Sequence, residues 1–150
     1  MILVVDSGST KTDWISLDNN GKIIFSTQTR GMNPQVLSSS IISERIINNF
    51  DLYHNRNSVS KIFFYGAGCG VSSSVNRILK VFQTIFKNSE FDIKEDTYAA
   101  VYSTIRVGEK AIVCILGTGS NCTYYDGKDI EQRIVSLGYT LMDEASGNFF

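Results

Sequence analysis

Short apolar runs separated by polar turns characterise the first thirty residues of the chain. Ile2–Val5 is a continuous apolar run typical of a buried strand, and Trp14–Leu17 is a second. A turn-forming segment rich in Asp, Asn and Gly at 18–21 separates the second run from a third, Lys22–Thr29. This spacing predicts three strands joined by tight turns as an antiparallel meander.

Helical spacing follows the meander. Asn33 before Pro34 is typical of a helix start, with asparagine as the cap and proline at the first helical position. Apolar residues then recur every three or four positions from Val36 to Phe50, which predicts one amphipathic helix. Further along we expect a strand at Lys61–Tyr65, a helix at Val75–Phe86 capped within Ser72–Ser74, a strand at Phe91–Lys94 and a short helix opened by Asp96.

The strand-first order begins again after Gly108. Three strand-like runs follow it, at Ala111–Leu116, Asn121–Tyr125 and Ile130–Val135. We therefore expect an α/β fold with a first lobe at residues 1–108 and the beginning of a second, similar lobe at 109–150. A complete second copy would need roughly one hundred further residues, so the chain is interpreted as the front half of a two-lobed protein.

Both lobe openings carry a turn of small, hydroxylated residues. Ser7 to Thr12 follow the first apolar run, and Gly117 to Ser120 follow Ala111–Leu116. Such turns expose backbone N–H groups, and two of them facing each other can hold a polyphosphate from both sides. Each turn taken alone is equally well explained as an ordinary polar hairpin.

Composition narrows the function classes. The 150 residues are 43% hydrophobic with a net charge of −1 and no basic stripe, which indicates a folded core and argues against a nucleic-acid partner. No run is long enough to span a membrane, and no charged leader segment precedes the first strand. The chain has three cysteines and no Cys-x-x-Cys motif, which favours a reduced, cytoplasmic protein. The three are Cys69, Cys114 and Cys122. His54 is the single histidine, so a His-based metal site has little support.

Five motifs follow one another along the chain: Asp6-Ser-Gly-Ser-Thr-Lys-Thr, Gly66-Ala-Gly, Asp96-x-x-Ala-Ala, Gly117-Thr-Gly-Ser-Asn-Cys and Gly138-x-x-x-x-Asp143-Glu-x-Ser-Gly. In order and spacing they resemble the BadF/BadG-type ATPases and N-acetylglucosamine kinases of the actin/hexokinase/Hsp70 superfamily. The resemblance implies ribonuclease-H-like (actin-like ATPase) lobes, each a mixed sheet flanked by helices, with ATP and Mg²⁺ between them. The adenosine-binding motif of that family lies beyond the region this chain matches.

The resemblance also assigns roles to two carboxylates. Asp6 would hold Mg²⁺, usually through water, and its alternative role is to hydrogen-bond its own turn. Asp96 would be the general base that takes a proton from a sugar hydroxyl, and its alternative role is a helix N-cap. The two roles of Asp96 are compatible, because a helix start also favours the charged form of a carboxylate.

Phosphate and sugar contacts are implied at further motif positions. Lys11 could equally be a solvated turn lysine, and Asn33 and Asp143 could equally be helix caps. Tyr139, Met142 and Ala145 depart from the residues usual in the family, which weakens the sugar assignment more than the kinase assignment. The implied phosphate contacts are Ser9, Thr10, Lys11, Thr12, Gly117, Thr118, Gly119 and Ser120, and the implied sugar contacts are Asn33, Gly68, Gly138 and Asp143.

The leading hypothesis is an ATP-dependent kinase of an amino sugar of the N-acetylglucosamine or glucosamine type, with a homodimer as the candidate oligomer. One alternative is an ATPase that activates a dehydratase and holds an iron–sulfur cluster through cysteines at a subunit interface. The cysteines form no evident pair suited to a cluster, which argues against it. The other alternative is a non-catalytic sugar-binding module.

The chain alone is expected to be inactive. We also expect poor covering of three apolar side chains, which favours self-association: Ile112, Ile115 and Ile134.

Overall fold

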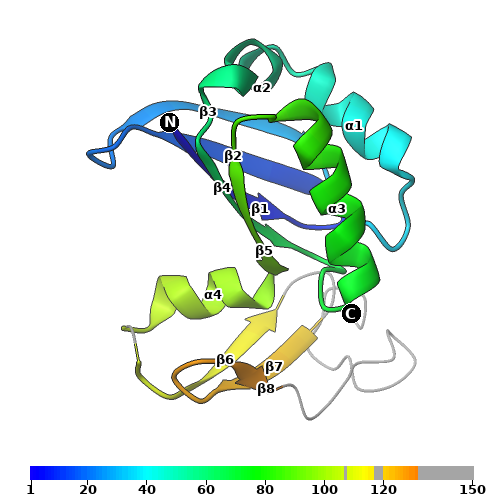
Figure 1. The fold of residues 1–150 in the computed structure, drawn as a ribbon. Helices are drawn as coiled ribbons and strands as arrows, with labels where there is room; N and C mark the ends of the chain where they lie inside the picture. The colour runs from blue at the N-terminus through cyan, green and yellow to red at the C-terminus, as the bar shows by residue number, and fades with distance from the viewer. Residues whose placement is uncertain (107, 117–119, 132–150) are drawn as a thin grey trace. The chain divides into compact units, whose positions relative to one another are not determined.

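The computed structural model of the chain describes residues 1–106, 108–116 and 120–131. The chain divides into two compact units, the first at Met1–Asp96 and the second beginning at Thr97. Figure 1 shows the elements of each unit along the chain. The lobe boundary expected at residue 108 stays a prediction.

A five-stranded mixed sheet forms the centre of the first unit. Its order is β3-β2-β1-β4-β5, with the first three strands antiparallel and β4 and β5 parallel to β1. The predicted meander and the predicted α/β class are both confirmed. The strands are β1 (Ile2–Ser7), β2 (Lys11–Leu17), β3 (Ile23–Arg30), β4 (Lys61–Gly66) and β5 (Glu90–Glu95).

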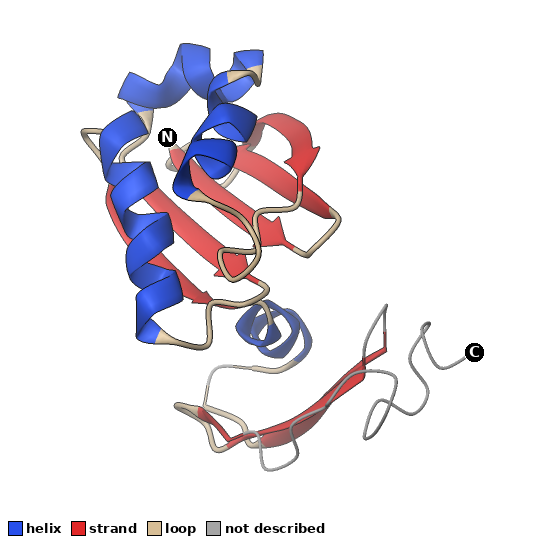
Figure 2. Ribbon diagram, turned by 90° about the vertical axis from the view of Figure 1, so that its right-hand side faces the viewer, coloured by secondary structure: helices blue, strands red, loops and turns tan. Residues whose placement is uncertain are grey.

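Helices cover one face of this sheet, as Figure 2 shows. They are α1 (Ser39–Ile47), α2 (Phe50–Asn55) and α3 (Ser72–Ile85), and a 3₁₀ turn at Arg56–Ser58 follows α2. Alternate strand residues point into the core between the layers, so that Leu3 and Val5 are fully buried while Val4 is not. The ring of Phe82 on α3 packs edge-on against Phe64 at 5.3 Å between centroids. The core is therefore built from every second residue of the strands and from helix residues three or four positions apart.

The single helix predicted from Pro34 to Phe50 is wrong at both ends. Asn33 heads only one isolated turn, in which its carbonyl accepts from the amide of Leu37 at 3.1 Å and its side chain accepts from Gln35 at 2.9 Å. The helix begins instead after Ser38, whose hydroxyl accepts from the amide of Ile41. Asn49 then caps a separate helix, α2.

Apolar spacing was a poor guide at the two ends of that segment. Val36 is 77% exposed and Phe50 is 76% exposed, so neither packs into the core. The predicted Ser72–Ser74 cap of α3 is also wrong, because the cap position is Val71, which makes no side-chain cap hydrogen bond. A helix start here is set by packing of the apolar face of α3 rather than by a side-chain cap.

The second unit begins with α4 (Thr97–Thr104) and continues as an antiparallel sheet in the order β6-β7-β8. These strands are β6 (Ala111–Leu116), β7 (Ser120–Tyr125) and β8 (Ile130–Glu131). Val101, Val113 and Tyr125 form its small core. The restart of strand order is confirmed as far as Glu131, beyond which the predicted strand and Ile134 lie outside the described residues. Ile112 is 71% exposed, and the self-association expected from it stays a prediction.

No helix in the described residues combines the length and apolar character needed to span a membrane.

Candidate active site

The parallel strands β1, β4 and β5 end together at one edge of the sheet. Their register places Ser7 beside Gly66 and Gly66 beside Glu95. Open α/β sheets commonly bind ligands at the carboxyl ends of such strands. Asp6, the turn after Ser7, the loop after Gly66 and Asp96 all lie at this edge, so the first unit brings three of the predicted motifs together.

The turn between β1 and β2 is held from two sides. The amide of Gly8 donates to the carbonyl of Lys11 at 3.0 Å, and the amide of Gly31 donates to the carbonyl of Thr10 at 2.8 Å. Gly31 also lies flat against the turn, because a Cβ at this position would overlap the backbone of Gly8 and Ser9. Ser9 and Thr10 are exposed at the tip. The turn is therefore fixed while its tip faces outward, as a phosphate contact requires.

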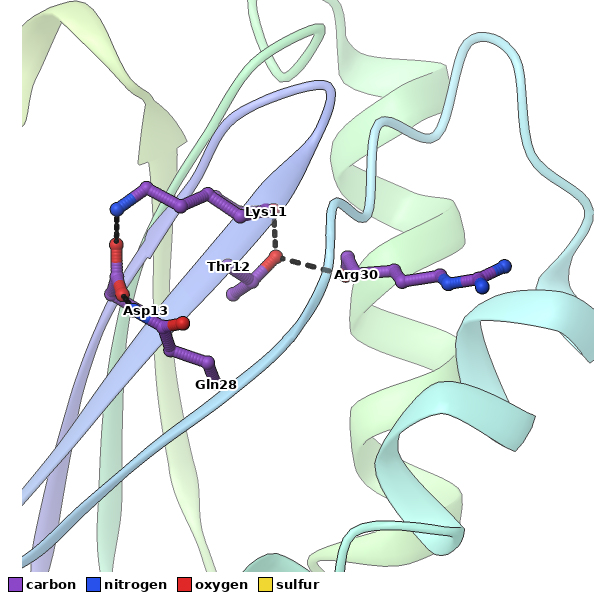
Figure 3. Close-up of polar contacts among 6 residues, drawn as sticks. Lys11, Thr12, Asp13, Gln28 and Arg30 are labelled. Atoms are coloured by element: carbon purple, nitrogen blue, oxygen red, sulfur yellow. Dashed lines mark hydrogen bonds and ion pairs between the residues drawn. The ribbon is translucent and has the colours of Figure 1, made fainter.

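A chain of hydrogen bonds runs beneath the turn. The amide of Met32 donates to Ser7 Oγ at 3.1 Å, Ser7 Oγ lies 2.8 Å from Thr12 Oγ1, and Thr12 Oγ1 donates to the carbonyl of Arg30 at 3.3 Å. Figure 3 shows the last of these contacts. The Thr12 hydroxyl is buried and holds the turn. The phosphate contact expected of Thr12 stays a prediction.

Two carboxylates face each other across the strands beside the turn. Asp6 and Asp13 are register partners, and Lys11 Nζ lies 2.9 Å from Asp13 Oδ2, as Figure 3 shows. Gln28 Nε2 also donates to Asp13 Oδ1 at 2.5 Å. Partial burial raises the pKa of the Asp6 carboxyl, the charge of Asp13 raises this pKa further and Lys11 lowers it. A carboxylate that a second carboxylate repels suits a cation, so the donor chemistry of Asp6 fits the expected Mg²⁺.

Other protein ligands for such a cation are few. Among the described residues, no group of three His, Cys, Asp or Glu side chains gathers in a way that could hold a metal. An ion at Asp6 would therefore complete its coordination with water and phosphate oxygens, as Mg²⁺ ordinarily does. Lys11 is paired with Asp13 and largely exposed, so its contact to phosphate also stays a prediction.

The loop after β4 brings together two residues that the sequence places far apart. The amide of Ala67 donates to the carbonyl of Ser7 at 2.8 Å, which ties this loop to the end of β1. Gly68 has a φ of +79°, and a Cβ there would overlap the side-chain oxygen of Asn33. Gln35 Nε2 donates to the carbonyl of Gly68 at 3.2 Å. The predicted sugar contacts Asn33 and Gly68 are thus neighbours, and only glycine suits the second position.

Asp96 follows the last residue of β5 and is half-buried, immediately before α4. It lies close enough to Cys69 and Glu95 for its charge to act on both. Burial raises the pKa of the Cys69 thiol to about 12, and Asp96 and Glu95 contribute. Burial, and then Asp96, raise the pKa of Glu95. The helix-cap role and the general-base role both agree with this position.

Glu95 is a further residue of this edge, and it was not among the predicted site residues. A Cβ on Gly70 would lie 3.1 Å from Glu95 Oε1, so this carboxylate reaches the loop after β4. The available signal was its position between a strand end and Asp96, which periodicity alone does not distinguish from an ordinary surface glutamate. The edge therefore carries two adjacent carboxylates beside the loop rather than one.

Several predicted site residues lie outside the described residues: Gly117, Thr118, Gly119, Gly138 and Asp143. Ser120 is the first residue of β7.

Comparison with solved structures tests the resemblance directly. A candidate N-acetylglucosamine kinase from Porphyromonas gingivalis is 32% identical to this chain, with a TM-score of 0.84 over 98% of it. The chain is similar in both sequence and fold to this candidate N-acetylglucosamine kinase. The resemblance expected from the five motifs is thereby confirmed, as is the actin-like ATPase lobe. This chain spans 52% of the length of that relative.

More distant structures share the fold alone. A candidate N-acetylglucosamine kinase from Chromobacterium violaceum is 17% identical, with a TM-score of 0.60 over 97% of this chain and 52% of its own. A polyphosphate/ATP-glucomannokinase from Arthrobacter sp. strain KM is 19% identical, with a TM-score of 0.55 over 97% of this chain and 65% of its own. No protein-family model matches the chain, and no curated protein does. The structural neighbours are sugar kinases.

Proposed function

We propose that the protein to which this chain belongs is a cytoplasmic, ATP-dependent kinase of an amino sugar of the N-acetylglucosamine or glucosamine type. One observation carries the proposal. The turn between β1 and β2, the Asn33–Gly68 contact and Asp96 share one sheet edge, in a chain 32% identical to a candidate N-acetylglucosamine kinase.

Asp96 would act as the general base. Phosphoryl transfer to an alcohol requires removal of the hydroxyl proton as the new P–O bond forms, and a positioned carboxylate can accept it. The backbone at the end of β5 holds Asp96 at the same edge as the turn after β1. Asn33, held against Gly68, would present its amide to the hydroxyl or acetamido groups of the sugar and so orient the acceptor.

The turn at Ser9 and Thr10 would meet the terminal phosphates of the nucleotide. Its exposed tip can offer backbone N–H groups, and its base is fixed by Gly31 and the buried hydroxyls. Asp6 is the residue that would hold Mg²⁺, which when bound neutralises the phosphate charge. The chain spans about half the length of that relative.

The test is a coupled ADP-release assay on the longer protein with a panel of amino sugars. Asp96→Asn should lower kcat by about a hundredfold or more while leaving sugar affinity within a few-fold, because it removes the base and keeps the shape. Asp92→Asn on the same strand is the matched control, since Asp92 faces Lys94 in a weak surface pair at 3.5 Å, and should retain activity.

Turnover unaffected by Asp96→Asn would show that Asp96 is not the base. Sugar binding without turnover on any hexose would instead support the non-catalytic module.

One observation keeps the dehydratase-activator alternative open. The sequence shows no cysteine pair evidently suited to a cluster, yet Cys114 and Cys122 lie side by side on neighbouring strands. Two copies of this pair would supply four thiolates, the number that iron–sulfur clusters commonly use. A brown colour with visible absorbance in anaerobically purified protein would favour this alternative, and colourless protein with kinase turnover would exclude it.

A further inference from the structure

Cys114 and Cys122 lie directly opposite each other in the β6·β7 hairpin. They are register partners, and their sulfur atoms are 3.2 Å apart. Opposed residues in antiparallel strands have Cα atoms about 4.5–5.5 Å apart. That separation falls within the range of about 4.4–6.8 Å that disulfides span. The backbone is thus already placed for a bond, and only the side chains need to rotate.

Both thiols are accessible, whereas the third is not. Cys114 and Cys122 are exposed, so a small reagent can reach either sulfur. Cys69 is 4% exposed, and burial raises the pKa of its thiol to about 12, which suppresses its reactive thiolate. The S–H of Cys114 donates to Cys122, a contact that raises the pKa of the Cys122 thiol. The chain therefore carries two accessible thiols that lie side by side, and one thiol that is buried.

We propose that Cys114 and Cys122 form a reversible intrachain disulfide, so that the β6·β7 hairpin is a redox-sensitive element. The oxidant is a low-molecular-weight disulfide. One cysteine thiolate attacks this disulfide, breaks its S–S bond and releases one small thiol. The second cysteine attacks the mixed disulfide, forms the Cys114–Cys122 bond and releases the other small thiol. The protein loses two electrons and two protons, and the small disulfide gains both.

The bond would tie two strands whose connecting residues are 117–119. Cys114 lies two residues before the end of β6 at Leu116, and Cys122 lies two residues after the start of β7 at Ser120. Its formation does not depend on the proposed kinase activity, so each idea can fail without the other.

The experiment equilibrates the full chain with mixtures of reduced and oxidised glutathione, blocks free thiols with iodoacetamide and analyses tryptic peptides by mass. Both cysteines lie in one peptide, between Lys110 and Lys128. Oxidation should make this peptide about 2 Da lighter and unreactive to iodoacetamide. The Cys69 peptide should stay alkylatable after unfolding. Two glutathione adducts on the peptide, or a bond between two chains, would overturn the proposal.

A register control separates strand geometry from mere closeness in sequence. Cys122→Ser combined with Asn121→Cys keeps three thiols and moves one to the opposite face of β7, because successive strand residues point to opposite faces. The wild-type pair should be half oxidised at a ratio of reduced to oxidised glutathione at least about tenfold higher than the ratio at which this variant is half oxidised. The wild-type chain in denaturant provides a second reference that needs no variant, and should show the same loss. Equal oxidation in the folded and unfolded wild-type chain would overturn the proposal.

Discussion

The hydroxyl of Ser7 lies 2.8 Å from the hydroxyl of Thr12, and both side chains are fully buried beside the exposed turn that joins β1 to β2. Ser7 accepts from the amide of Met32, and Thr12 donates to the carbonyl of Arg30. The donor order that satisfies every contact therefore runs from Met32 through Ser7 and Thr12 to Arg30. Two small hydroxyls thus connect the turn to the segment after β3.

Thr12→Val should destabilise the fold by about 1–3 kcal/mol, because it leaves Ser7 Oγ without its acceptor in a buried site. Urea unfolding followed by circular dichroism measures the change. Ser9→Ala at the exposed tip is the control, and should stay within about 0.5 kcal/mol of the wild type. Equal stability of Thr12→Val and the wild type would show that the hydroxyl chain contributes nothing.

Gly31→Ala should displace the turn, because the added Cβ would overlap the backbone of Gly8 and Ser9. We expect a loss of about 1–3 kcal/mol in unfolding free energy, in the range of overpacked sites. Gly8→Ala is an informative comparison, since a Cβ there would meet its nearest neighbour at an ordinary 3.6 Å and should be tolerated. If Gly8→Ala proves the more damaging of the two, the close approach of Gly31 does not define the turn.

Asn49 links α2 to the edge strand β3. Its Oδ1 accepts from the amide of Leu52 at 3.2 Å, and its Nδ2 donates to Thr27 Oγ1 at 2.9 Å and to the carbonyl of Gln28 at 3.3 Å. Asn49→Ala should cost about 1–2 kcal/mol in thermal or urea unfolding. Asn49→Asp keeps the cap acceptor but loses the donors, so it should fall between the wild type and Asn49→Ala. A cost equal to that of Asn49→Ala would assign the whole effect to the strand contacts.

The Asp6 carboxyl should make stability depend on pH in an unusual direction. Burial and Asp13 raise its pKa above the unfolded value, so the folded chain binds this proton more tightly than the unfolded chain. Stability from this group is present below the unfolded value of 3.8 and is lost as pH rises through the folded pKa. Asp6→Asn should therefore be more stable than the wild type at neutral pH, by under about 1 kcal/mol because the group is partly solvated.

The measurement is urea unfolding of both proteins from acid to neutral pH. The two curves should converge at the acid end, where Asp6 is protonated. Lys11→Gln serves as the opposite control, since removal of the cation that lowers the pKa of Asp6 should reduce stability at neutral pH. A difference between wild type and Asp6→Asn that does not change with pH would show that the carboxyl charge is not its cause.

Predictions from the sequence succeeded where a local pattern was sufficient and failed where packing decided. The meander was predictable because its runs and turns are contiguous in sequence. The helix start at Ser38 was not, because Asn33 and Pro34 carry an equally good local signal, yet Asn33 heads an isolated turn beside Gly68. Phe50 matched the helical period yet begins α2 on the surface.

The candidate site divides in the same way. Asp6, the small-residue turn and Asp96 were recognisable from type and spacing, and the structure gathers them at one edge, while their chemical roles stay predictions. Glu95 was not recognisable, because only the parallel pairing of β4 and β5 brings it to the loop after Gly66.

The amino-acid sequence alone was enough to predict the order of the strands, the small-residue turn after the first strand and the position of Asp96 before a short helix. These features depend on backbone preferences and periodicity over a few residues. The folded structure was needed to show that Gly31 braces the first turn, that Asn33 meets Gly68 and that Cys114 lies opposite Cys122. Each of these contacts joins residues that lie apart in the sequence, and strand register and sheet order, which no single apolar run specifies, bring them together.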